Sequence, residues 1–272
     1  MIQSPALDQI FLARPLAHRG YHDAAAARPE NSAAAMTAAV RAGYGIELDV
    51  QLSSDGGAMV FHDADLNRMT TATGPVRDRS KDALNRITLT QSNEPIPALT
   101  DILQLVAGRT PILIELKDQT ADGGHGGPSD NLALAQAVAQ DLAGYDGPAA
   151  VMSFNPDIVI LLAQLLPDRA RGLTTDSYRP EQRPADHSPA DWAALRDMAG
   201  LAPSGATFIS HSAADLARPR VQALRTQGMP VLCWTIRSRE AEAAARRLAD
   251  NITFEGYPAP RPNLDPIKKS PT

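Results

Sequence analysis

Hydrophobic residues follow two alternating patterns along most of the chain. Short apolar segments with the two-residue period of β-strands are each followed by longer segments with the period of α-helices. Eight strands alternating with helices over about 250 residues are typical of a (β/α)8 TIM barrel, which is an α/β fold. We expect these strands near residues 16, 48, 114, 151, 172, 208, 232 and 253.

An open, doubly wound sheet is the alternative fold. It normally uses fewer strands, and no G-x-G-x-x-G motif follows the first predicted strand. We therefore expect one barrel domain over residues 1–258, with a short insertion after the second strand at about 64–98. A Pro-rich C-terminal tail, 259–272, follows this domain.

Composition narrows the class of protein. The net charge of −5 argues against a nucleic-acid partner, because neutralising phosphates requires a basic surface. The single cysteine excludes an internal disulfide and fits a reducing compartment. We see no signal peptide and no apolar run long enough for a membrane span, so we expect a cytoplasmic protein. Nothing in the sequence indicates an oligomeric state.

The segment 46–63 combines a predicted hairpin with reactive side chains. Its first strand alternates apolar and polar residues, so Glu47 and Asp49 project from one face. A turn at 55–57 reverses the chain, and the short return strand ends directly before His62-Asp63. Considered alone, this segment could also be an exposed strand with a solvated acidic face.

Other reactive residues stand at the ends of further predicted strands. His18 and Arg19 end the first strand, Glu115 and Lys117 end the third, and Trp234 ends the seventh. The carboxyl ends of all strands of a parallel barrel meet at one rim, where active sites of this fold lie. We therefore expect these residues to converge on one site with the hairpin.

The residue types at this rim indicate phosphoryl-transfer chemistry. Three carboxylates, Glu47, Asp49 and Glu115, form an oxygen-only ligand set that suits one divalent cation, Mg²⁺ or Ca²⁺. Two histidines can transfer protons near neutral pH, and an arginine and a lysine can bind an anionic substrate.

The order and spacing of several short motifs resemble the glycerophosphodiester phosphodiesterases over roughly residues 14–258. As a set these motifs are highly specific. They are His18-Arg19-Gly20, Pro29-Glu30-Asn31-Ser32, Glu47-Leu48-Asp49-Val50, Ser54-Asp55-Gly56, His62-Asp63 with Leu66, Arg68 and Thr70, Glu115-Leu116-Lys117, and Trp234-Thr235.

The resemblance implies a TIM barrel and a role for each residue. It implies that a divalent metal binds to Glu47, Asp49 and Glu115, and that His18 acts as general base and His62 as general acid. It also implies that Arg19 and Lys117 bind the phosphate and that Trp234 packs against the glycerol or the leaving group. From their positions we expect Glu30 to support the site or the dipole of the following helix. We expect Asn31 or Ser32 to cap that helix, and Asn31 to act first as a cap and otherwise to support the site.

The implied activity is hydrolysis of a small glycerophosphodiester, such as glycerophosphocholine or glycerophosphoethanolamine, in glycerol and lipid metabolism. The products would be glycerol 3-phosphate and an alcohol, formed through a cyclic phosphate. One alternative is a lysophospholipase D-like activity, which requires an exposed apolar lip that the 4% aromatic content does not favour. Another is a non-catalytic module that binds metal or glycerophosphate, and a third is a sugar isomerase with the same barrel.

Two stretches depart from the family pattern. Ile236-Arg237 stands where the family often has a small polar residue, and Thr253-Phe254-Glu255-Gly256 replaces a threonine–aspartate pair. Both stretches lie at the predicted rim. We expect them to change substrate preference and to leave the chemistry unaltered.

Overall fold

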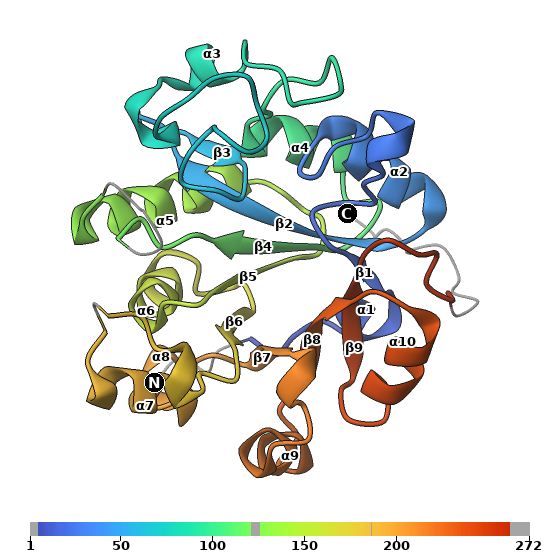
Figure 1. The fold of residues 1–272 in the computed structure, drawn as a ribbon, viewed down its shortest axis with the longest axis vertical. Helices are drawn as coiled ribbons and strands as arrows, with labels where there is room; N and C mark the ends of the chain where they lie inside the picture. The colour runs from blue at the N-terminus through green and yellow to red at the C-terminus, as the bar shows by residue number, and fades with distance from the viewer. Residues whose placement is uncertain (1–4, 121–125, 186, 262–272) are drawn as a thin grey trace.

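The computed structural model describes residues 5–120, 126–185 and 187–261, and in it the predicted strands form a closed parallel barrel (Figure 1). Strand β1 pairs with both β2 and β9, which closes the ring, so the predicted (β/α)8 TIM barrel is confirmed. The barrel strands are β1 (Leu16–Ala17), β2 (Gly45–Leu52), β4 (Ile112–Leu116), β5 (Ala149–Ser153), β6 (Arg171–Thr175), β7 (Phe208–Ser212), β8 (Val231–Ile236) and β9 (Asn251–Phe254).

Helices surround the barrel and connect successive strands (Figure 1). The side chains on the outer face of the strands, such as Ile46, Leu48 and Val50, pack against these helices in one continuous hydrophobic core. The helices are α2 (Ala33–Ala42), α4 (Leu99–Val106), α5 (Pro128–Leu142), α6 (Pro156–Leu165), α7 (Pro189–Arg196), α8 (Leu201–Ser204), α9 (Pro219–Thr226) and α10 (Arg239–Ala245).

The N-terminal end of the barrel is filled with apolar side chains. Strand β1 contains only Leu16–Ala17, and Ile10–Ala13 before it form a helical turn, α1. Phe11 of this turn joins Leu16, Leu113 and other buried residues in a second hydrophobic cluster. Gly172 leaves room for this packing, since a Cβ there would lie 2.1 Å from the ring of Phe208.

The insertion after β2 has its own small core. Strand β3 (Ala58–Val60) pairs antiparallel with β2, and the following segment contains the short helix α3 (Lys81–Leu84). Figure 1 shows this segment at one side of the barrel, opposite α7 and α8. Although the sequence of the insertion is polar and irregular, it buries one cluster, namely Met59, Phe61, Leu66, Val76, Leu84, Leu89, Ile96 and Ala98.

The predicted tail falls largely outside the described residues, since residues 262–272 are not among them. In the part of the chain that the structure describes, every helix is too short or too polar to cross a lipid bilayer.

Candidate active site

Three buried carboxylates lie together inside the barrel on β2 and β4. Asp49 and Glu115 are direct partners in the parallel register of these strands, and Glu47 precedes Asp49 on the same face. The exposed fractions of Glu47, Asp49 and Glu115 are 2%, 1% and 5%. One oxygen of each lies within 4.8 Å of the others, so the three could hold one metal ion.

The electrostatics of this cluster fit a cation. Burial and the charges of Asp49 and Glu115 raise the pKa of Glu47 well above its usual range, because its charge is not fully compensated. Lys117 lies beside the cluster, with its Nζ 2.8 Å from Asp49 and in contact with Glu115. Against the effect of burial, Lys117 and neighbouring cations hold the pKa of Asp49 well below its usual range. Carboxylate oxygens alone are the ligand set that Mg²⁺ and Ca²⁺ prefer.

Asn31 supports this cluster and does not cap the helix that follows it. Its Nδ2 donates to Asp49 Oδ2 at 2.9 Å, and its Oδ1 accepts from the Asp49 backbone at 3.3 Å. Ser32 caps α2 by accepting from the backbone N–H of Ala35. Of the two predicted caps, Ser32 is therefore confirmed, and the expectation that Asn31 acts first as a cap is wrong. Its left-handed backbone, with a φ of 57°, precedes the extended cap position that Ser32 fills.

Arg19 links the cluster to Glu30. Its backbone N–H donates to Glu47 Oε2 at 3.0 Å, and its side chain contacts Glu30 at 2.8 Å and Asp49 at 3.4 Å. Glu30 also binds Arg68, with an Nη2–Oε1 distance of 2.6 Å. Glu30 therefore binds two arginines at the site. Of its two expected roles, these contacts match support of the site and not support of the helix dipole.

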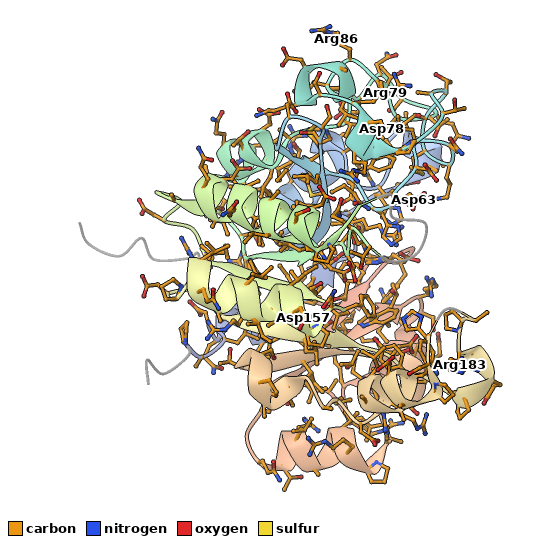
Figure 2. The ribbon with its side chains drawn as sticks, turned by 90° about the vertical axis from the view of Figure 1, so that its left-hand side faces the viewer. Asp63, Asp78, Arg79, Arg86, Asp157 and Arg183 are labelled. Carbon is orange, nitrogen blue, oxygen red and sulfur yellow. The ribbon has the colours of Figure 1, made fainter. Side chains whose placement is uncertain are left out.

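His62 is held by the residue next to it. Its Nδ1 lies 2.7 Å from Asp63 Oδ1, and Arg68 donates from Nε to Asp63 Oδ2 at 2.6 Å. Figure 2 shows Asp63 well below Arg86, near the junction of the insertion with the barrel. We call His62, Asp63 and Arg68 the His62 arm.

His18 is held by a residue from the other end of the chain. Its Nδ1 contacts Glu255 Oε2, and Arg237 donates from Nε to Glu255 Oε1 at 2.7 Å. Both partners come from the stretches that depart from the family pattern, and sequence reasoning assigned them to substrate preference. One sequence feature could have indicated this contact: Glu255 directly follows the last predicted strand and therefore lies on the same rim as His18. We call His18, Glu255 and Arg237 the His18 arm.

A cavity of about 1170 Å³ joins these groups. It extends from the carboxylate cluster between the insertion and the segment 176–200, and Figure 2 shows Asp63 and Arg183 of these two segments on the same side of the molecule. One wall is aromatic: the rings of Phe154 and Trp234 are 5.5 Å apart, and Trp234 donates from Nε1 to the carbonyl of Ser210.

The structure brings together nearly all residues that the sequence indicated. The cavity is lined by His18, Arg19, Glu47, Asp49, His62, Glu115, Lys117 and Trp234. Glu30 and Asn31 lie behind it, on Arg19 and Asp49 respectively. The arrangement can bind a divalent cation and an anionic substrate, and it places two imidazoles where they can transfer protons.

Comparisons with known proteins agree with this geometry. The model of the glycerophosphoryl diester phosphodiesterase family matches residues 18–252. A glycerophosphodiester phosphodiesterase of Bacillus altitudinis is 38% identical over 108 residues, 37% of this chain and 43% of the relative. The uncharacterised protein YqiK of Bacillus subtilis is 31% identical over 167 residues, 58% of this chain and 65% of the relative. The alignments thus span less than two thirds of both relatives.

Solved structures show the same fold. A phosphodiesterase of Oleispira antarctica, in complex with the product sn-glycerol-3-phosphate, superposes with a TM-score of 0.71 at 21% identity. The match covers 94% of each chain.

Proposed function

The chain belongs to the glycerophosphoryl diester phosphodiesterase family, and we propose that it hydrolyses glycerophosphodiesters to glycerol 3-phosphate and an alcohol with the help of a divalent cation. One observation carries this proposal: the acidic cluster, two carboxylate-bound histidines and two cations line a single cavity. The Bacillus altitudinis relative has this activity in its name, and the Oleispira antarctica structure contains sn-glycerol-3-phosphate.

Glu47, Asp49 and Glu115 would hold the cation, Mg²⁺ or Ca²⁺. When bound, this ion polarises the substrate hydroxyl and neutralises charge on the phosphoryl group. Arg19 and Lys117 line the same cavity and would bind the phosphate oxygens, where negative charge increases in the transition state.

The two histidine arms would carry out the proton transfers. His18 removes the proton from the glycerol hydroxyl next to the phosphate, and the hydroxyl oxygen attacks phosphorus. The bond from phosphorus to the leaving alcohol breaks, and His62 gives that alcohol its proton, which leaves a cyclic phosphate. Water then opens the ring with the two roles reversed. Burial lowers the pKa of His18 although Glu255 raises it, and this supports a neutral imidazole that accepts a proton.

The surface of the molecule favours a small substrate over a lysolipid. Within the described residues, Leu132 on α5 is the sole exposed large hydrophobic residue, and it is not among the residues that line the cavity. The aromatic wall with Trp234 lies inside the cavity, where it can pack against the glycerol or the leaving alcohol. A module that only binds glycerophosphate would not need two histidines that are each held by a carboxylate.

Release of glycerol 3-phosphate tests this proposal. We expect turnover of glycerophosphocholine and glycerophosphoethanolamine by enzyme supplied with Mg²⁺ or Ca²⁺. Prolonged dialysis against EDTA should reduce turnover to background, and addition of the ion should restore it. Equal turnover after dialysis would contradict the role of the metal, and turnover of lysophosphatidylcholine alone would contradict the substrate class.

A further inference from the structure

A second group of metal-ligating atoms lies beside the acidic cluster. His18, His22 and Glu255 each offer one ligand atom, and these atoms lie within 4.8 Å of one another. We propose that these three residues form a separate site for a zinc ion, and that zinc bound there inhibits the enzyme. The inhibition rests on the proposed function, whereas the binding does not.

The position of His22 is the observation that carries this inference. Its Nε2 lies 3.6 Å from Glu255 Oε2, the same oxygen that contacts His18 Nδ1. A distance of 3.6 Å is too long for a hydrogen bond. Two ligand atoms on a tetrahedral zinc ion, with bonds of about 2.0–2.1 Å, are separated by about 3.4 Å. The spacing of His22 and Glu255 thus fits two ligands of one ion, and Glu255 would exchange its direct hydrogen bond to His18 Nδ1 for the ion.

Within the described residues, Glu255 is the one charged partner of the His22 imidazole. Its Nε2 is shielded from solvent and makes no hydrogen bond with any of the residues that the structure describes. A buried nitrogen without a partner is costly unless something binds it. A zinc ion between His22 and Glu255 would satisfy this atom.

The backbone on both sides of the site is fixed. Gly20 donates to the Glu47 carbonyl at 3.1 Å, and the N–H of His22 donates to the Gly20 carbonyl at 2.9 Å. At Gly20 a Cβ would lie 2.9 Å from that of Ala35, so only glycine permits this turn, which has a φ of 79°. Glu255 is fixed by a backbone hydrogen bond to Ile236. The ligands are therefore already close before an ion binds.

The ligand types separate this site from the acidic cluster. Two imidazoles and one carboxylate are a common zinc ligand set, whereas the oxygen-only cluster suits Mg²⁺ or Ca²⁺. The side chains of His18, His22 and Glu255 are 14%, 25% and 19% exposed, so an ion can reach them from solvent. Arg237 occupies the other oxygen of Glu255 and offsets part of its charge, so we expect weaker binding than at a structural zinc site.

Zinc at this site would remove the proposed base. An imidazole that binds a metal through Nδ1 keeps its remaining proton on Nε2, and it has no free lone pair to accept another. His18 bound in this way cannot take a proton from the substrate. Among the residues that the structure describes, the His62 arm has no second imidazole in hydrogen-bond contact, and it would keep its function.

Cobalt binding tests the site without any activity measurement. Co²⁺ has visible absorption bands when it is bound by imidazoles, and excess Mg²⁺ is present to fill the acidic cluster. We expect wild-type protein to bind one Co²⁺ with such bands and His22→Gln to bind it about tenfold or more weakly. His187→Gln is the matched control, because His187 packs against Trp192 away from this site, and it should bind like wild type. Circular dichroism checks that both variants fold.

Zinc inhibition tests the consequence. At saturating Mg²⁺, the inhibition constant for Zn²⁺ should rise about tenfold or more in His22→Gln, while kcat without zinc stays unchanged. Co²⁺ affinity that is equal in wild type and His22→Gln, or Co²⁺ bands that Mg²⁺ abolishes, would overturn the site. An enzyme that binds Co²⁺ as expected but shows no phosphodiesterase turnover would instead overturn the proposed function and leave the site standing.

Discussion

The His18 arm and the His62 arm hold their histidines in the same way but from different parts of the chain. In each arm a carboxylate contacts Nδ1 and an arginine binds the second oxygen of that carboxylate. Asp63 follows His62 directly, whereas Glu255 lies 237 positions after His18. The side chain of His18 is 14% exposed and that of His62 is 31% exposed.

The His62 arm is formed by residues close in sequence, whereas the His18 arm depends on the whole fold. The His62 arm lies within one short loop and is closed by Arg68, which also binds Glu30. The His18 arm exists only because closing the barrel brings β9 beside β1. Burial at that seam lowers the pKa of His18 and favours its neutral form. We infer that the arms differ in task, with His18 as base and His62 as acid.

Removing either histidine should have the largest effect. His18→Ala and His62→Ala should each lower kcat on glycerophosphocholine by about 10²–10⁴-fold, which is the usual contribution of a positioned acid or base. A substrate with a p-nitrophenol leaving group separates the two, because p-nitrophenolate departs without a proton. We expect that substrate to restore most of the rate of the first p-nitrophenolate release in His62→Ala and little of that in His18→Ala, because ring opening in the second step uses both histidines whatever the leaving group.

Single-turnover kinetics with both substrates check this assignment, because they measure the first step alone. The reverse pattern, with rescue of His18→Ala, would exchange the two roles. Equal rescue of both variants would show that the arms do not divide the work.

Loss of the orienting carboxylates should have the next largest effect. Glu255→Gln and Asp63→Asn preserve shape but remove the charge that fixes each imidazole, and misplacement of a catalytic group can reduce the rate by about 10²-fold. We expect kcat to fall while KM changes little, because neither carboxylate is proposed to bind substrate. A rise in KM at constant kcat would instead place that carboxylate on the substrate.

The pH dependence should distinguish the arms as well. Glu255 raises the pKa of His18 through its hydrogen bond and its charge. Glu255→Gln removes this contribution, so the pKa of His18 should fall and the imidazole should remain neutral at lower pH. The acidic limb of kcat/KM should therefore move to lower pH in Glu255→Gln and stay in place in Asp63→Asn. A move to higher pH would show that His18 is not the base.

Much of the fold was predictable from hydrophobic periodicity. The apolar positions of β2 and β4 face the helices, and their polar positions face the barrel interior, so the pattern located both the strands and the inward carboxylates. The segment 10–13 was not predictable in this way. It is apolar because Phe11 closes the barrel end, and an apolar run of four residues has no period that separates a helix from a strand.

The site was predictable where its partners are close in sequence. Glu47 and Asp49 share a strand, and His62 precedes Asp63, so spacing alone placed them together. Contacts made by barrel closure could not be predicted, because no local pattern shows that Glu255 reaches His18. Asn31 was assigned as a cap because its residue type favours that position, whereas its left-handed backbone is set by the turn that brings it to Asp49.

The arginines behind the two carboxylates should have the smallest effects, and these effects should be unequal. Arg68 makes hydrogen bonds to both Asp63 and Glu30 and is 47% exposed, whereas Arg237 makes one to Glu255 and is 67% exposed. An exposed ion pair is worth about 0–1 kcal/mol, which corresponds to about fivefold at most. We therefore expect Arg237→Gln to lower kcat by less than about fivefold and Arg68→Gln by about tenfold.

A double-mutant cycle decides whether each arginine acts through its carboxylate. In the Asp63→Asn background, Arg68→Gln should reduce kcat only by the part of its effect that acts through Glu30 and Arg19. In the same background, Arg237→Gln should reduce kcat by as much as it does alone. The opposite result, with Arg237→Gln losing its effect in the Asp63→Asn background, would couple the two arms across the cavity. The arms would then be one cooperative network, and assigning base and acid to separate halves of the site would no longer follow from their geometry.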